Sequence, residues 1–171
     1  MKNSKIKKIS NTALFTAIIA TTAWISIPTP FGINLSFSIF GVCLAGFYLG
    51  FKQGFLATLT YIFLGAIGIP VFSQFSGGFS VLCGISGGFI WGFLITSVLC
   101  GMTKSKKNKP IKILLCFLAV ISCHLAGVIQ YSIVSGNNLW VSFLTASFPF
   151  LIKDMIVVFL ADFIAKKVKI K

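Results

Sequence analysis

The stretch GAIGIPVFSQFSGGFSVLCGISGGFIWG, from Gly65 to Gly92, lies between two long apolar segments and decides how this chain must fold. It is rich in glycine, contains Pro70 and carries no charged side chain. It is too broken for a regular spanning helix and too apolar for an ordinary solvent loop. Irregular backbone at membrane depth survives only where protein buries it or where it lines a cavity, because lipid cannot satisfy its amide and carbonyl groups. We therefore expect this stretch to form part of a ligand chamber.

The composition around this stretch is that of an integral membrane protein. Of the 171 residues, 57% are hydrophobic and only 10% are charged. Apolar runs of spanning length recur along the chain. The net charge of +13 comes from lysines gathered at segment ends, so we expect no nucleic-acid partner. The five cysteines show no metal-ligand spacing and are interpreted as small packing residues.

The apolar runs predict an all-α membrane protein with six transmembrane helices, forming a single substrate-binding domain over residues 1–171. The glycine-rich stretch would be an extracellular loop between the third and fourth helices. Proline ends the first span because it removes a hydrogen-bond donor. The six predicted spans are 11–27, 34–51, 53–67, 84–102, 111–134 and 149–167.

The last apolar block, residues 139–165, admits two interpretations. It could be one kinked helix. However, Pro149 suits the first turn of a helix, where its missing amide hydrogen costs nothing. We therefore prefer a short interfacial element over 139–147, followed by the sixth span, and Trp140 fits an interfacial anchor in that arrangement.

The lysines test the six-span count independently. They precede span one, join spans two and three and spans four and five, and follow span six. All these connections fall on one side of the membrane, so the positive-inside rule predicts cytoplasmic termini in a bacterial plasma membrane. These lysines are Lys2, Lys5, Lys7, Lys8, Lys52, Lys104, Lys106, Lys107, Lys109, Lys112, Lys166, Lys167, Lys169 and Lys171.

Asp154 is the sharpest polar signal, because it is one of two acidic residues and lies about one turn into span six. An ionised group at a helix centre costs roughly 2.5 to 3.5 kcal/mol to insert. Asp154 is therefore either a helix-start carboxylate exposed to headgroup water or a hydrogen-bond acceptor facing a cavity. Adjacent Lys153 points about 100° away, so no direct pair is implied; it either snorkels outward or binds an anion.

Other polar and small residues have weaker signals. His124 is either an interhelical hydrogen-bonding residue or a ligand contact, and Gln130 lies roughly 120° around the same helix. Asp162 precedes Lys166 by four residues, which predicts a surface ion pair. Small residues on span one form a ridge that would let a partner helix approach closely or pack within the bundle. This ridge consists of Ala13, Ala17 and Ala20.

The sequence contains no recognisable catalytic constellation. It lacks a second carboxylate near Asp154, a histidine cluster, a phosphate-binding loop and a nucleophile elbow. We therefore expect neither enzymatic activity nor a cofactor or metal. Uphill movement of a substrate would need energy from elsewhere.

Several motifs together resemble the BioY family, the biotin-specific S components of energy-coupling factor (ECF) vitamin transporters. The resemblance covers nearly the whole chain. Its departures are Lys153, where the family typically has glycine, Val157, where it has lysine, and Ile85 with Ser86, where it has Pro-Thr. The matching residues are Gly65, Gly68, Pro70, Val71, Phe72, Gly77, Gly78, Leu82, Gly84, Gly87, Gly88, His124, Gly127, Pro149, Phe150 and Asp154.

The resemblance implies a membrane subunit that binds biotin near the outer face. It would associate with a transmembrane coupling protein carrying two cytosolic ATPases, for which the alanine ridge is a docking candidate. Asp154 would accept from the ureido ring, and Lys153 would supply the displaced cation, for the ligand carboxylate or to offset Asp154. The candidate binding residues are Phe72, Phe75, Gly77, Gly78, Gly84, Ser86, Gly87, Gly88, Trp91, His124, Gln130, Lys153 and Asp154.

Three alternatives remain open at this point. One is an S component for a biotin precursor or for another vitamin such as riboflavin or thiamine. The second is a small integral-membrane enzyme acting on lipid, which the scarcity of acids and histidines within the spans disfavours. The third is a pore-forming or structural membrane protein, which would need no saturable site. Binding measurements with several vitamins would separate them.

Overall fold

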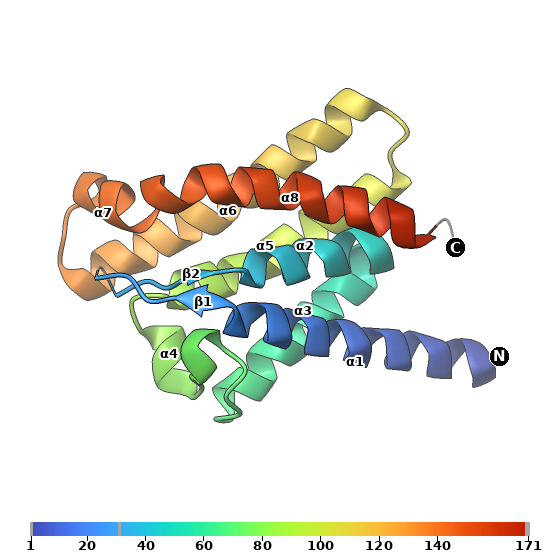
Figure 1. Ribbon diagram of the computed structural model, residues 1–171, viewed down its shortest axis with the longest axis horizontal. Coiled ribbons are helices and arrows are strands. Elements are labelled where there is room, and N and C mark those ends of the chain that lie inside the picture. Colours follow the sequence, from blue (N-terminus) through green and yellow to red (C-terminus); the bar gives the residue numbers. More distant parts are fainter. Residues whose placement is uncertain (1, 31, 170–171) are drawn as a thin grey trace.

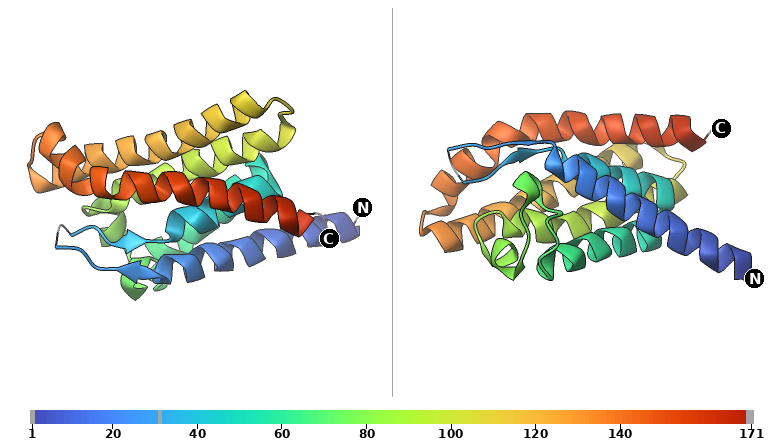
Figure 2. Two further views of the ribbon diagram at one scale, coloured as in Figure 1. Left: turned by 45° about the horizontal axis from the view of Figure 1, so that its top comes forward. Right: turned by 60° about the horizontal axis from the view of Figure 1, so that its bottom comes forward.

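The computed structural model describes residues 2–30 and 32–169 and shows a bundle of helices that run along one long axis (Figure 1). Both described chain ends lie at the same end of the bundle in all three views (Figures 1 and 2). Within the described residues, six helices have twelve residues or more. They are α1 Lys2–Trp24, α2 Ser38–Leu49, α3 Phe51–Ala66, α5 Gly87–Met102, α6 Lys109–Ser135 and α8 Phe148–Lys169.

Helix α5 lies at the centre of the bundle. It packs against α6, α2 and α3, while α1 covers α2 and α3, and α8 covers α2. The shared core is apolar and includes fully buried Ile19, Val42, Val120 and Val158, one from each of four helices. Small polar side chains inside it bond to backbone carbonyls, as Thr96 does to the Ala119 oxygen at 3.0 Å. Buried hydroxyls thereby avoid the cost of an unmet hydrogen bond.

The short elements cluster at the end of the bundle opposite the termini (Figure 1). An antiparallel hairpin pairs Ser26 with Ser36 and Ile27 with Leu35. The other short elements there are helix α7 and two pieces within the glycine-rich stretch. These elements are β1 Ser26–Ile27, β2 Leu35–Ser36, η1 Ser73–Phe75, α4 Phe79–Cys83 and α7 Leu139–Ala146.

The hairpin corrects two predicted boundaries. Span one was expected over 11–27 and span two from residue 34, but α1 ends at Trp24 and α2 begins at Ser38. Pro28 and Pro30 force the residues before them into extended conformation, which favours a strand there over a further helical turn. The turn between the predicted spans 34–51 and 53–67 also lies earlier than residue 52, at Gly50, whose φ of +87° suits glycine.

Helix α3 ends at Ala66 and α5 begins at Gly87, so the irregular segment covers 67–86 and is slightly longer than the gap of 68–83 left between the predicted spans. This segment is partly ordered, because it contains η1 and α4. Gln74 and Phe75 have φ values of +58° and +52°, which non-glycine residues rarely adopt. The end of the chain matches expectation more closely, since α7 and α8 are separate helices and Pro149 lies in the first turn of α8.

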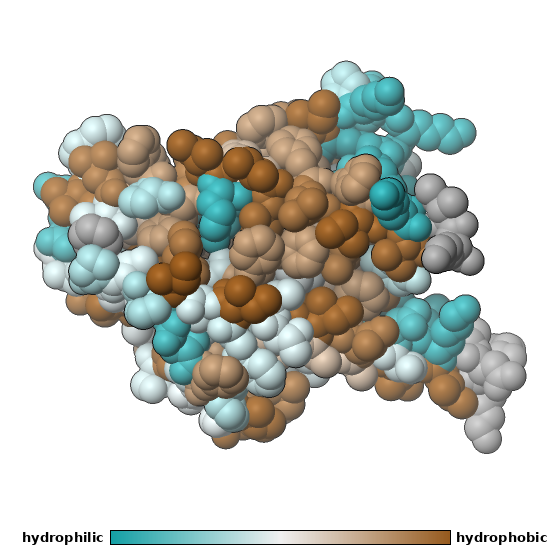
Figure 3. Space-filling view, viewed as in Figure 1, coloured by the Kyte–Doolittle hydropathy of each residue, from teal (hydrophilic) through white to brown (hydrophobic). Residues whose placement is uncertain are grey.

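Apolar side chains cover the middle of the bundle, and hydrophilic ones gather at the end where the termini lie (Figure 3). Among the described residues, two helical segments are long and apolar enough to cross a membrane by themselves, Gly87–Ser105 and Lys109–Ser135. The first continues α5 into η2 Thr103–Ser105. The count of six spans therefore stays a prediction. Lys171 lies outside the described residues, as do the side chains of Lys2 and Lys169.

Candidate functional site

A cavity of about 60 Å³ lies near the hairpin end of the bundle. Its wall combines aromatic and aliphatic side chains with polar groups from the hairpin region, from the irregular segment and from α8. The polar residues are Asn34, Ser36, Ser38, Ser73, Ser86, Lys153 and Asp154. Aromatic walls with a few placed polar groups are typical of small-molecule sites. The aromatic wall residues are Tyr61, Phe72, Phe89, Phe93 and Phe150.

Asp154 is the acidic group of this cavity. The residue is only 8% exposed, and its Oδ1 accepts no hydrogen bond from the described residues. The Lys153 ammonium lies 2.8 Å from Oδ1 as an ion pair without the alignment of a hydrogen bond. The same ammonium donates to the Ser36 carbonyl oxygen at 2.6 Å. Asp154 Oδ1 can therefore still accept a hydrogen bond, and the Lys153 cation lies beside it. Both residues line the same cavity.

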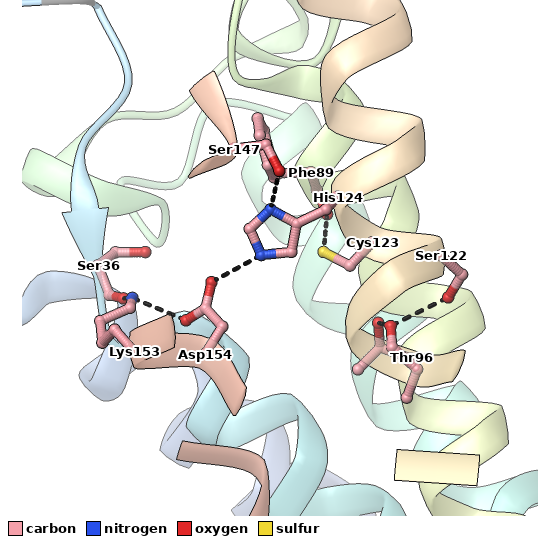
Figure 4. A network of polar contacts seen from close by, with 10 residues as sticks. Ser36, Phe89, Thr96, Ser122, Cys123, His124, Ser147, Lys153 and Asp154 are labelled. Carbon is pink, nitrogen blue, oxygen red and sulfur yellow. Dashed lines mark hydrogen bonds and ion pairs between the residues drawn. The ribbon is translucent and has the colours of Figure 1, made fainter. Parts of the chain in front are cut away.

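The other carboxylate oxygen of Asp154 is held by a buried chain of side chains (Figure 4). His124 Nε2 lies 3.2 Å from Asp154 Oδ2, and Ser147 Oγ lies 2.8 Å from His124 Nδ1. A carboxylate oxygen accepts, so His124 Nε2 donates to Asp154 Oδ2, and the Ser147 hydroxyl bonds the other ring nitrogen. The chain links α6 to α8 and orients Asp154 so that Oδ1 is left for the cavity.

The hydrogen-bonded residues Ser147, His124 and Asp154 have the order of a hydrolytic Ser-His-Asp triad. The sequence analysis did not predict this arrangement. A nucleophile must reach its substrate, and Ser147 is fully buried and absent from the cavity wall. The arrangement therefore orients a carboxylate and does not present the Ser147 hydroxyl to a ligand. Because Ser147 and His124 are 23 residues apart, no local spacing signals their contact.

Two interpretations of the charged pair are wrong. Asp154 is buried and not a helix-start carboxylate exposed to headgroup water. Lys153 does not snorkel outward, since its side chain is 25% exposed and bends into the cavity wall. The angle between neighbouring helical residues did not imply a direct pair, yet a lysine is long enough to curl back to Oδ1. The predicted pair of Asp162 and Lys166 does form.

The candidate glycines line no part of the cavity, and Gly77, Gly87 and Gly88 allow close backbone packing. A Cβ on Gly87 would come within 1.9 Å of the Leu82 carbonyl oxygen, and one on Gly88 within 2.2 Å of the Ala126 oxygen. Gln130 Nε2 donates to the carbonyl oxygens of Leu82 and Gly84, both at 2.8 Å. These contacts fix the irregular segment against α5 and α6. Gly77, Gly78 and Gly84 likewise lie outside the wall, whereas Ser86 is part of it.

Two candidate aromatic residues also lie outside the wall. Phe75 is 63% exposed and stacks on Trp24 with ring centroids 5.1 Å apart. Trp91 is 42% exposed, and its Nε1 donates to the Leu82 oxygen at 3.3 Å. Phe72 does line the cavity, and its ring packs edge-to-face with that of Tyr61, with ring centroids 5.4 Å apart. The expectation that all three line the chamber is corrected to Phe72 alone.

Comparisons with known proteins agree on one family. The chain matches the BioY family over residues 1–171. It is 34% identical over 168 residues to "Probable biotin transporter BioY" of Pyrococcus horikoshii, covering 96% of this chain and 98% of the relative. It is 40% identical over 103 residues to "Biotin transporter BioY" of Thermotoga maritima, and that match spans 60% of each chain.

A solved structure extends this similarity to the fold. The crystal structure of the S-component for biotin from an ECF-type ABC transporter superposes with a TM-score of 0.91. The match covers 100% of this chain and 95% of the other, at 26% sequence identity. The helical arrangement described above is therefore shared with a membrane substrate-binding subunit.

Proposed function

Because this chain belongs to the BioY family, we propose that it is the S component that captures biotin for an ECF transporter. The family is one of transporter components, so the lipid-enzyme alternative falls away. One observation carries the choice of ligand. Asp154 Oδ1, an acceptor without a hydrogen bond, and Lys153 Nζ, a donor, lie 2.8 Å apart on one cavity wall.

A ureido ring matches that pair. Its N–H and C=O groups lie side by side, so the N–H donates to Asp154 Oδ1 while the carbonyl oxygen accepts from Lys153. Hydrogen bonds to charged groups contribute about 1.5 to 3 kcal/mol each. The aromatic wall suits the thiophane ring and the aliphatic chain. Because the cavity holds about 60 Å³ and ligand pockets commonly exceed ~300 Å³, its walls move apart as biotin enters.

Equilibrium binding to the purified protein in detergent tests the proposal. We expect submicromolar affinity for biotin, weaker binding of desthiobiotin, which retains the ureido ring, and no saturable binding of thiamine or riboflavin. Tight binding of thiamine or riboflavin in place of biotin would assign the site to another vitamin. No binding of any of the four would overturn the transporter assignment for this cavity.

Lys153→Met is expected to weaken biotin binding by about tenfold to a hundredfold. The change removes the donor to the ureido carbonyl and the cation that offsets Asp154. Because Lys153 lies beside Asp154 Oδ1, its role is at the ureido end, and biotin methyl ester should lose affinity by the same factor. Calorimetric titration of both ligands measures this. A loss confined to biotin would show that Lys153 pairs with the ligand carboxylate.

His124→Leu is expected to weaken biotin binding about tenfold. It leaves Asp154 Oδ2 without a donor and the Ser147 hydroxyl without its partner, so the carboxylate loses its orientation. His124→Gln is the matched control, because its amide nitrogen can donate near the position of Nε2 and should retain most of the affinity. Equal losses in both variants, measured by the same titration, would contradict the orienting role.

The proposal also includes a partner that supplies the energy for transport. We propose a transmembrane coupling protein with two cytosolic ATPases, supported by the structural match to an ECF-type subunit. Ala13 and Ala17 are exposed on α1, but Ala20 is buried inside the bundle, so the docking ridge shortens to the first two residues. The lysine-rich end supports cytoplasmic termini and six spans under the positive-inside rule.

A further inference from the structure

A second cavity lies at the lysine-rich end of the bundle, far from Asp154 along the long axis of the bundle. It holds about 380 Å³ between the start of α6, the end of α8 and η2. Helices α6 and α8 meet near His124 and Asp154 and then diverge toward this end (Figures 1 and 2). We call the cavity between these diverging ends the groove.

The groove has positive charge that the described residues do not neutralise. Lys107, Lys109, Lys112 and Lys166 line it together with one acid, Asp162. Asp162 is already paired with Lys166. The chain has only one other acidic side chain, Asp154, which is held in the first cavity. Three of these lysines therefore form no ion pair with an acidic side chain among the described residues, so the groove is complementary in charge to an anionic ligand.

The inner wall of the groove is apolar. Ile113, Cys116 and Phe159 line it, and Phe159 meets Phe117 of the facing helix edge-on, with centroids 6.0 Å apart. Ile113, Phe117 and Phe159 also expose apolar surface on the flank of the bundle. A ligand that fits must carry an anionic group at the lysines and a hydrocarbon chain along this wall.

We propose that this groove binds a phospholipid with an anionic headgroup. The phosphate lies among Lys107, Lys109 and Lys112, and an acyl chain follows Ile113 and Phe159 between α6 and α8. Basic pockets between helices at a membrane surface bind acidic headgroups in this way. A free phosphate would use the lysines alone and leave the apolar wall uncovered. Binding at this end is independent of biotin and of the first cavity.

The first test uses the unmodified protein in neutral detergent, with native mass spectrometry as the readout. We expect retained dioleoyl phosphatidylglycerol and much less dioleoyl phosphatidylcholine at the same concentration. Glycerol 3-phosphate should not displace the retained lipid. Equal retention of both lipids would overturn the proposal. Displacement by glycerol 3-phosphate would reassign the groove to soluble phosphates, and displacement only by an acidic peptide would reassign it to a protein partner.

The second test locates the site. Changing Lys107, Lys109 and Lys112 to glutamine should weaken phosphatidylglycerol binding by roughly fivefold per lysine, about a hundredfold in all. The matched control changes Lys5, Lys7 and Lys167, which are exposed and lie outside the groove, and should change binding little. The same three groove positions as arginine should retain binding. An equal loss in both glutamine triples would show general surface attraction and overturn the proposal.

Discussion

Replacing Asp154 with asparagine is expected to weaken biotin binding about a hundredfold, or ~3 kcal/mol. Both carboxylate oxygens face donors. Oδ1 faces the Lys153 ammonium and the proposed ureido N–H, and Oδ2 faces His124. Asparagine supplies an acceptor at only one of these positions and no charge at either. The Lys153 cation then stays in a mostly buried wall without its counter-ion, which adds to the loss.

Asp162→Asn is the matched control for this change. It removes the only other acidic side chain, which pairs with Lys166 at the opposite end of the bundle. We expect biotin affinity to stay within about twofold, since a partly exposed ion pair contributes little. Titration of biotin into both purified variants measures the contrast. Unchanged affinity in Asp154→Asn would place the ureido group elsewhere in the molecule.

The sequence predicted those parts of this molecule whose signals are local. An acid about one turn into an apolar helix marks Asp154, and Pro149 separates α7 from α8. Pro28 and Pro30 end the first helix near the observed residue, because proline constrains the backbone beside it. The four-residue spacing of Asp162 and Lys166 predicted their ion pair. Each of these features depends on neighbours within about one turn of helix.

The features that were not predicted depend on distant partners. The Ser36 carbonyl and Lys153 are 117 residues apart, so no spacing pattern could link them. Ser147 was predicted only as the end of the short interfacial element over 139–147, and its bond to His124 follows from how α7 returns toward α6. Phe75 and Trp91 were placed in the chamber because aromatic residues suit a ligand. Only the packing of the irregular segment decides which aromatic side chains face inward.

The glycines illustrate the same division. Their density correctly indicated an unusual backbone around residues 67–86, but not what each glycine is for. The expectation was close approach to a ligand, whereas Gly87 and Gly88 let backbone meet backbone. Gln130 then bonds the carbonyl oxygens of Leu82 and Gly84. The segment acts on the cavity indirectly, because it fixes the start of α5, from which Phe89 and Phe93 reach the wall.

Gly87→Ala should therefore destabilise the protein by about 3 kcal/mol, the upper part of the range for overpacking. The new Cβ would lie 1.9 Å from the Leu82 carbonyl oxygen and 2.4 Å from Gln130 Nε2. Neither neighbour can yield cheaply, because the first is backbone and the second holds that backbone. The start of α5 must shift, which also disturbs the aromatic wall. For a chain of this size we expect the melting temperature to fall by roughly 6 to 12 °C.

Gly84→Ala is the control, since it lies in the same segment and its Cβ would come no closer than 3.1 Å to a neighbouring atom. Its φ of −82° suits any residue. We expect a shift of about 3 °C or less, measured for both variants by thermal unfolding in detergent without biotin. A shift of about 3 °C or less in both variants would mean that the segment tolerates added side chains generally. The wall of the first cavity would then depend on the long helices rather than on the backbone contact at Gly87.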